Sequence, residues 1–463
     1  MPDGGAEKAD VDVVTSAPIG MFGRLLQGYM AQKARIHRLS KEAGWIITGQ
    51  IATMLGALAL VRVLTEYLDP AQYGQLALGL TVAGLVSQVV MGGIMNGIGR
   101  FYSVAAENQD LHGYLRASRR LLGYVTIAVL IIGFALMIGL LWLGYSQWIG
   151  LAAAALVFSV LGGYNSALSG IQNAARQRAI VAFHSGLDAW LKIMLAVGVM
   201  LWLGTSSTAV VIGYACSSLL ITVSQLVFLR RTIPLQYTHI PDRQQWMRQI
   251  WAYSLPFTSW GVFTWMQQVS DRWALQAFAS ANDVGQYVVL FQLGYTPIML
   301  ITGMAMNLLG PIMYQCSGDG TDHARNANIH RISWQITRVC FTVTLLGFAF
   351  TFALHEWLFG ILVAPEFRVG SHLLPWVVLA GGMFASGQML SLKLMSEMKA
   401  SAMTTAKIVS ALIGVLLNVI GAALAGLQGV VWAIAAFSAI YAVWMVVLGR
   451  RILVNNTGGS SIL

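Results

Sequence analysis

Two pairs of opposite charges lie inside long apolar stretches of this chain and could handle anions or protons. Asp188 and Lys192 are four residues apart, so on a helix they face the same side, one turn apart. Asp271 and Arg272 are adjacent and diverge by roughly 100° on a helix, so each needs its own partner or a water-filled space. In a membrane-spanning helix an ionisable side chain costs about 2.5–3.5 kcal/mol on insertion scales, which makes all four residues candidates for function.

The two carboxylates allow different interpretations. Asp188 either neutralises Lys192 and only permits membrane insertion, or it titrates and couples transport to an ion gradient. Asp271 is the second candidate for ion coupling, because transport driven by a proton or sodium gradient needs a titratable group in the cavity. Beyond such a gradient we expect no cofactor and no metal site, because the sequence has no nucleotide-binding glycine loop and no His or Cys cluster.

Polar residues recur at helical spacing along three of the apolar stretches. The stripe in residues 253–278 is formed by Trp260, Thr264, Gln267, Gln268 and Asp271. The stripe that begins in residues 149–171 is formed by Ser159, Asn165, Ser166, Ser169, Gln172, Asn173 and Arg176. The stripe in residues 285–309 is formed by Gln286, Gln292, Tyr295, Thr296 and Asn307. Such stripes indicate either hydrogen bonds between helices or a hydrated cavity, and we favour a wide cavity between two lobes.

The basic residues within or beside the apolar stretches outnumber the acidic ones. Arg62, Lys192 and Arg272, together with Arg100, exceed Asp188 and Asp271. A cavity lined by these groups attracts anions, and Arg in particular favours phosphate. Two alternatives stay open, because Arg62 at a helix end can extend to the membrane interface and lipid head groups can satisfy the same cations. We therefore predict substrate binding by Arg62, Arg100, Lys192, Gln267, Gln268 and Arg272.

Twelve apolar stretches must position these residues. The chain has 463 residues, of which 57% are hydrophobic and 10% charged, so a soluble globule is excluded. We expect an all-α polytopic membrane protein whose spans are 43–63, 76–98, 121–143, 149–171, 182–203, 208–229, 253–278, 285–309, 337–359, 373–394, 404–424 and 429–448. Most Lys and Arg residues fall in alternate connections, which places both termini in the cytoplasm. The net charge of +10 follows from these connections and indicates no nucleic-acid partner.

The chain repeats itself once. Residues 210–231 align without gaps with residues 430–451, and Tyr73-Gly74-Gln75 matches Val284-Gly285-Gln286. Because six spans separate the copies, the two halves share one orientation, as in transporters with parallel repeats. We expect a cytoplasmic tail with a basic amphipathic helix on the inner leaflet (1–42), two six-helix lobes (43–231 and 253–451), a cytoplasmic linker (232–252) and a cytoplasmic C-terminal tail (452–463).

Four segments resemble the Wzx-type polysaccharide flippases of the multidrug/oligosaccharidyl-lipid/polysaccharide (MOP) exporter superfamily. They are RVLTEYLDPAQYGQLAL at 62–78, GGIMNGIGRF at 92–101, GIQNAARQR at 170–178 and DRWALQAFASANDVGQY at 271–287. The resemblance implies two six-helix lobes that move an undecaprenyl-diphosphate-linked oligosaccharide across the bacterial inner membrane, for O-antigen, capsule, lipopolysaccharide or exopolysaccharide biosynthesis. It implies alternating access, with the diphosphate at the cationic groups, the sugars on the polar stripes and the polyprenyl tail in lipid.

The resemblance also implies other partners, and it leaves competing functions. Membrane lipids, a polysaccharide polymerase and a chain-length regulator are the expected partners, and we expect a monomer without enzymatic activity. A drug or cation antiporter of the same superfamily is the main alternative, although its cavity should be acidic. A permease for sugars or organic anions, a polymerase and an assembly scaffold are further alternatives. The outer loops near 64–75 and 360–372 are too short for the catalytic loop of a polymerase.

Overall fold

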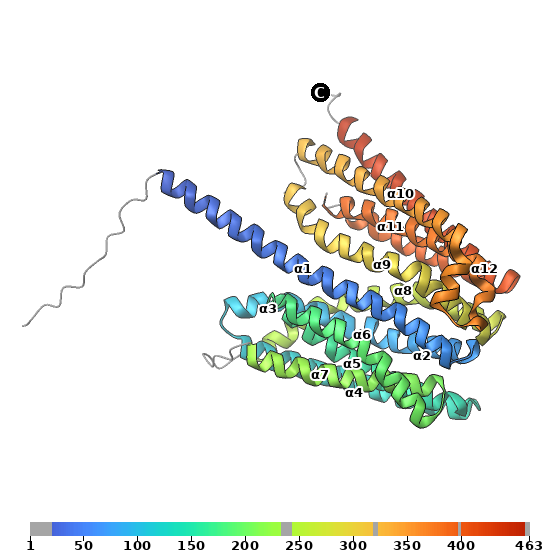
Figure 1. The fold of residues 1–463 in the computed structure, drawn as a ribbon. Coiled ribbons are helices and arrows are strands. Elements are labelled where there is room, and N and C mark those ends of the chain that lie inside the picture. Colours follow the sequence, from blue (N-terminus) through green and yellow to red (C-terminus); the bar gives the residue numbers. More distant parts are fainter. Residues whose placement is uncertain (1–20, 233–242, 318–322, 397–399, 459–463) are drawn as a thin grey trace, which may run out of the picture.

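The computed structural model describes residues 21–232, 243–317, 323–396 and 400–458, and these contain helices and no strands. The prediction of an all-α polytopic membrane protein is confirmed (Figure 1). The elements are α1 (Met21–Tyr67), α2 (Pro70–Leu85), η1 (Val86–Met91), α3 (Gly92–Glu107), α4 (Leu111–Trp142), η2 (Ser146–Trp148), α5 (Ile149–Ala174), α6 (Arg178–Leu203), α7 (Ser207–Thr232), α8 (Arg243–Phe278), α9 (Ala281–Ser317), α10 (His323–Leu362), η3 (Pro365–Leu373), α11 (Leu374–Ser396) and α12 (Ala400–Gly458).

Within the described residues, ten helical stretches are long and apolar enough to cross a membrane. One of them, Thr405–Arg450, is broken at Ala425 and Gly426, where the sequence predicts a short loop at 425–428. Gly426 has a φ of 53°, a left-handed conformation that glycine adopts without a steric penalty. Helix α8 covers the predicted span 253–278 in addition to the ten stretches. With the break and α8 counted, the helices match the twelve predicted crossings.

The predicted amphipathic helix of the N-terminal tail is not a separate element. Helix α1 runs without interruption from Met21 to Tyr67, and at 1.5 Å per residue it is about 70 Å long (Figure 1). A helix continuous with a membrane span cannot lie flat on the inner leaflet, so this interpretation is wrong for residues 21–41. Lys41, Glu42 and Ala43 at the junction are good helix formers, and nothing there interrupts the helix. Residues 1–20 lie outside the described part of the chain.

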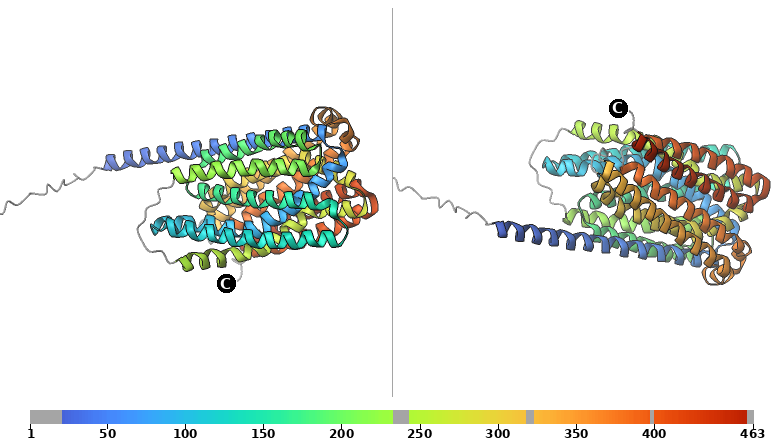
Figure 2. Two further views of the ribbon diagram at one scale, coloured as in Figure 1. Left: turned by 90° about the horizontal axis from the view of Figure 1, so that it is seen from below. Right: turned by 90° about the horizontal axis from the view of Figure 1, so that it is seen from above.

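The helices form one elongated bundle in which α1 begins and α12 ends at the same end (Figure 2). We call this the termini end, and the opposite end the far end. In the N-terminal half α5 packs against α2, α3, α4 and α7, while α6 packs against α1 and α7. In the C-terminal half α11 packs against α9, α10 and α12, and α12 packs against α8. Part of the predicted linker, 243–252, forms the first turns of α8, and the exact lobe limits stay a prediction.

The two halves cross at the far end through a pair of glycines. A Cβ atom on Gly74 of α2 would collide with the carbonyl oxygen of Ala281, and one on Gly285 of α9 would collide with that of Pro70. These glycines occupy matching positions in the sequence repeat. The reciprocal contact therefore lets two backbones meet where any larger residue would hold them apart.

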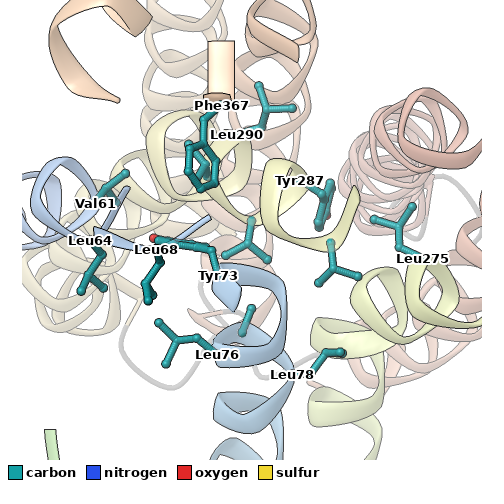
Figure 3. Packing of buried hydrophobic residues seen from close by; sticks show 14 of the residues in the cluster. Val61, Leu64, Leu68, Tyr73, Leu76, Leu78, Leu275, Tyr287, Leu290 and Phe367 are labelled. Carbon is teal, nitrogen blue, oxygen red and sulfur yellow. The ribbon is translucent and has the colours of Figure 1, made fainter. Parts of the chain in front are cut away.

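Buried side chains close the far end around this crossing (Figure 3). Phe367 of η3 is 1% exposed, and its ring lies edge-on to Tyr73 with the ring centroids 5.6 Å apart. The backbone N–H of Ala364 donates to Thr65 Oγ1 of α1 at 3.2 Å. The segment that connects α10 to α11 thus joins the C-terminal half to α1 and α2.

A second seam between the halves lies between α3 and α8. A Cβ atom on Gly93 would collide with Thr258 Oγ1, and one on Gly97 would collide with Ser254 Oγ. Two small residues four positions apart let membrane helices approach closely. The glycines of the segment GGIMNGIGRF are therefore explained by the packing of this seam.

Candidate binding cavity

A cavity of about 540 Å³ lies between the halves, on the termini side of the Gly74–Gly285 crossing. Helices α2, α8, α9, α11 and α12, with η1, contribute its walls. Its lining residues are Leu80, Thr81, Gly84, Gln88, Phe263, Thr264, Trp265, Gln267, Gln268, Val269, Arg272, Phe291, Tyr295, Thr296, Met299, Phe384, Gln388, Lys407, Ile408, Ser410, Ala411, Phe437 and Tyr441. Among the described residues, the lining contains two cationic side chains, Arg272 and Lys407, and no carboxylate, so this part of the lining is net positive.

Arg272 is the cation in the part of the cavity nearest the far end. Its guanidinium carbon lies 5.5 Å from the centre of the Phe291 ring, a distance at which the ring face attracts a cation. Among the described residues it forms no ion pair, and its buried Nε has no hydrogen-bond partner. A guanidinium in this state retains its planar donors for an anion that enters the cavity.

Among the described residues, the Asp271 carboxylate forms no ion pair with the Arg272 side chain, as the adjacent spacing predicts. The carboxylate is 2% exposed and accepts hydrogen bonds from Tyr287 Oη at 2.6 Å and from the backbone N–H of Arg272 at 2.7 Å. It does not line the cavity. An ion that used Asp271 would have to reach it between α8 and α9, and its role in ion coupling stays a prediction.

The rest of the α8 stripe faces the cavity. Thr264, Gln267 and Gln268 are lining residues, and Gln88 Nε2 of the N-terminal half donates to Gln268 Oε1 at 2.8 Å. The side chain of Trp260 lies outside the described part of the structure. From α9, Tyr295 and Thr296 also line the cavity, whereas Gln292 accepts a hydrogen bond from Tyr73 Oη at 2.6 Å. These two stripes therefore agree with a polar cavity.

The stripe on α5 has a different explanation and does not reach the cavity. Thr222 Oγ1 donates to Asn165 Oδ1 at 2.6 Å, and Asn165 Nδ2 donates to the carbonyl oxygen of Ser218 at 3.1 Å. One turn further along, Gln225 Nε2 donates to Ser169 Oγ at 3.0 Å. The stripe is a ladder of hydrogen bonds between α5 and α7, which satisfies polar groups inside the membrane. The cavity interpretation is wrong for this helix.

Asp188 and Lys192 form an ion pair within the N-terminal half. Lys192 Nζ lies 2.6 Å from Asp188 Oδ2, and Ser217 Oγ of α7 donates to Asp188 Oδ1 at 3.0 Å. Lys192 Nζ also lies 5.5 Å from the centre of the Phe158 ring. Neither charged residue lines the cavity, and each has its opposite charge one turn away. The geometry favours the neutralising interpretation of this pair.

Two further cations predicted to bind substrate also lie outside the cavity. Arg62 forms an ion pair with Glu66, one turn further along α1, beside a groove between α1 and α6. Arg100 is exposed in the middle of α3. Of the six predicted binding residues, the structure brings Gln267, Gln268 and Arg272 together and leaves Arg62, Arg100 and Lys192 elsewhere. Spacing along one helix cannot tell which neighbouring helix a side chain meets.

Sequence reasoning missed Lys407 and the aromatic wall beside it. Lys407 sits in the second turn of α12 and lines the cavity, although it is not among the binding residues that the sequence predicts. The wall comes from three helices: the ring centroids of Phe291 and Tyr295 are 4.6 Å apart, those of Tyr295 and Phe384 are 6.2 Å apart, and those of Phe384 and Tyr441 are 4.8 Å apart. No sequence pattern indicates that residues so distant along the chain lie side by side in the fold.

Known proteins share both sequence features and fold with this chain. A family model described as "Polysaccharide biosynthesis protein" matches residues 39–317. No curated protein matches the chain. Its fold is similar to that of an inward-facing multidrug resistance MATE family transporter of the MOP superfamily, with a TM-score of 0.66, 15% identity, and 89% of this chain and 96% of that chain covered.

Two further solved structures show the same fold. The lipid II flippase MurJ in an inward closed conformation has a TM-score of 0.64 and 11% identity, with 88% of this chain and 87% of that chain covered. A mutant of the Vibrio cholerae MATE transporter VcmN has a TM-score of 0.59 and 13% identity, with 92% and 98% covered. At these identities the likeness concerns the fold alone.

Proposed function

The chain belongs to the polysaccharide biosynthesis protein family, and we propose that it is a flippase for an undecaprenyl-diphosphate-linked oligosaccharide. It would move this glycolipid across the bacterial inner membrane by alternating access, for the synthesis of a surface polysaccharide. The fold supports a transporter, because it is shared with MATE transporters and with the lipid II flippase MurJ. The observation that carries the proposal is the guanidinium of Arg272, which has no ion-pair partner among the described residues and lies in a cavity whose described lining has no carboxylate.

The cavity suits the two polar parts of such a substrate. Arg272 offers a planar set of donors that matches the oxygens of a diphosphate. Gln267 and Gln268 supply amide donors and acceptors for sugar hydroxyl groups, and the aromatic wall offers apolar faces beside them. A volume of about 540 Å³ is within the usual range for small-molecule sites, about 300–1,000 Å³. A longer glycan would require the halves to separate.

The lipid tail would stay outside the cavity. The seam between α3 and α8 is closed by the contacts of Gly93 and Gly97, whereas Gly303 of α9 faces open space. The tail would therefore leave through a lateral gap between the halves other than this seam. If both termini are cytoplasmic, as the charge distribution predicts, the far end is the outer side and is closed in this conformation. Transport would then require the crossing of Gly74 and Gly285 to open.

One alternative function is favoured by a specific observation. The fold is shared with multidrug MATE transporters, which would make the chain an ion-coupled antiporter for cationic drugs. A cavity for cations needs carboxylates, however, and the lining residues that the structure describes include Arg272 and Lys407 and no Asp or Glu. The same lining would suit a permease for another anionic solute. We therefore place the glycolipid first and the antiporter second.

The test is glycolipid accumulation in cells that lack this protein. Lipid-linked repeat units would be extracted and assayed for protection from a glycan-processing enzyme added to the outer side. We expect trapped intermediates that the wild-type gene releases, that Arg272→Ala does not release and that Arg272→Lys releases in part. Arg331→Ala is the matched control, because Arg331 is exposed on α10 and outside the cavity.

Two results would change the assignment. Normal glycolipid turnover combined with altered resistance to cationic drugs would support the antiporter. Full release of trapped intermediates by Arg272→Ala, at wild-type protein levels, would show that Arg272 does not bind the substrate.

A further inference from the structure

We infer that Lys407 is a second anion-binding station in the cavity, which receives the diphosphate of the substrate before Arg272 does. This inference rests on the proposed function and adds a direction to it. It is carried by the placement of the two cations in one cavity, by a described lining that contains no carboxylate and by the aromatic wall that lies beside both.

The two cations lie at opposite ends of the cavity. Asn418 Nδ2 of α12 donates to Ser270 Oγ of α8 at 2.9 Å, so these two positions are level with each other. Lys407 precedes Asn418 along α12 toward the termini end, and Arg272 follows Ser270 along α8 toward the far end. At 1.5 Å per residue the two side chains originate about 20 Å apart along the helices. A diphosphate is much shorter than this, so it contacts one cation at a time.

Lys407 differs from the other lysines whose side chains the structure describes. Lys192 is paired with Asp188, and the buried Nζ of Lys393 donates to the carbonyl oxygen of Gly449 at 3.0 Å. Lys407 is half-buried, and in the described part of the chain it makes no ion pair. Its backbone carbonyl accepts from Ser410 Oγ at 3.2 Å, and its side chain lines the cavity. A desolvated ammonium group of this kind gains most from an anionic ligand.

The aromatic wall connects the two stations. It begins at Phe291, on which Arg272 stacks, and continues through Tyr295 and Phe384 to Tyr441, all of which line the cavity with Lys407. The hydrocarbon core of a bilayer is about 30 Å thick, so a diphosphate that crosses it passes through most of that depth between the two cations. A cation at each end shortens the distance over which the diphosphate has no partner. With the termini end cytoplasmic, Lys407 is the station reached first.

The experiment measures binding kinetics on the purified full-length protein in nanodiscs, with farnesyl diphosphate as the soluble probe. The variants are Lys407→Gln, Lys407→Met and Lys407→Arg, with Arg272→Ala for comparison and Arg331→Gln as a charge-matched control outside the cavity. Loss of a charged contact should weaken affinity about tenfold or more in Lys407→Gln and Lys407→Met. Most of that loss should appear in the association rate, because Lys407 acts first. Arg272→Ala should instead raise the dissociation rate, and Lys407→Arg should resemble the wild type.

Each alternative result has a distinct meaning. If the wild-type protein does not bind farnesyl diphosphate, the proposed function itself is wrong, and the role of Lys407 falls with it. A second result would overturn the station at Lys407 alone. In that result the wild type binds farnesyl diphosphate, Arg272→Ala weakens binding, and both neutral Lys407 variants associate at the wild-type rate. The proposed function would then stand. An equal loss in Arg331→Gln, or an equal loss for farnesol without the diphosphate, would also overturn the inference. Equal thermal unfolding of either neutral variant and the wild type confirms that the comparison is made on folded protein.

Discussion

The two charged pairs, one in each half of the molecule, show how spacing decides what a buried charge can do. Asp188 and Lys192 are one turn apart on α6 and neutralise each other at 2.6 Å. Asp271 and Arg272 are adjacent on α8, so their side chains diverge: the carboxylate binds Tyr287 and the guanidinium faces the cavity. Both pairs satisfy the carboxylate locally, yet only the second leaves a cation unpaired. A pair at one-turn spacing stabilises the fold, whereas an adjacent pair can present a charge to a ligand.

The largest effect should be the difference in glycolipid release between two double variants, each of which neutralises both members of one pair. Asp271→Asn with Arg272→Gln should abolish glycolipid release, because a lost contact to a charged group costs about 2–5 kcal/mol of substrate or transition-state binding. Asp188→Asn with Lys192→Gln should retain most of the release, since it removes two charges that already cancel. Release assays on equal amounts of membrane-inserted protein make the comparison. Equal loss in both double variants would contradict the functional difference between the pairs.

The next largest effect is on the stability of the protein and comes from the ion pair between Asp188 and Lys192. Lys192→Gln leaves the Asp188 carboxylate with Ser217 as its remaining partner and should lower the free energy of unfolding by about 1–3 kcal/mol. Adding Asp188→Asn should restore much of that loss, because an amide replaces the unpaired charge. Thermal unfolding of the two single variants and the double variant in detergent forms a double-mutant cycle. A coupling energy near zero would show that the ion pair does not stabilise the protein.

A smaller effect is expected at the partner of Asp271. Tyr287→Phe removes the hydroxyl that donates to the buried carboxylate, while the backbone N–H of Arg272 remains. The free energy of unfolding should fall by about 1–2 kcal/mol. Binding of farnesyl diphosphate should change little, because Arg272 keeps its place on Phe291. A loss of binding as large as that of Arg272→Ala would mean that Tyr287 and Asp271 position the guanidinium.

The sequence predicts those features that depend on local spacing. Hydropathy and helical period give the all-α class, the crossings and the break at Ala425 and Gly426. Adjacency alone predicts the divergence of Asp271 and Arg272. Glu66 follows Arg62 by one turn on the same helix, but the prediction that Arg62 binds substrate did not consider this ion pair. These are relations between residues on one helix, which periodicity determines.

Relations between helices could not be predicted in the same way. The stripe on α5 has the same spacing as the stripe on α8, yet Asn165 and Ser169 meet α7 while Gln267 and Gln268 meet the cavity. A polar stripe indicates that this face of the helix has a polar neighbour, which can be either water or another helix. Lys407 was missed for this reason, because its importance depends on residues contributed by four other helices.

The smallest effect distinguishes hydrogen bonds that join the halves from hydrogen bonds within one half. Gln88 contributes the bond to Gln268 across the cavity, and Gln225 contributes the bond to Ser169 between α7 and α5. Removing either bond should cost about 0.5–1.5 kcal/mol. In Gln225→Ala this loss should appear in the free energy of unfolding, since both partners move together. In Gln88→Ala this loss should instead change the ratio of the closed conformation to the conformation with separated halves. A change of about 1 kcal/mol shifts this ratio about fivefold.

The measurement uses spin labels at Gln147 of the N-terminal half and Asn282 of the C-terminal half, both exposed at the far end, in a background without native cysteines. Distance distributions between the labels should show a larger separated population for Gln88→Ala than for Gln225→Ala. Because Gln88 binds its partner only while the halves are close, its loss acts on the closed conformation alone. Identical distributions in the two variants would show that the bond between Gln88 and Gln268 forms with equal strength in every conformation.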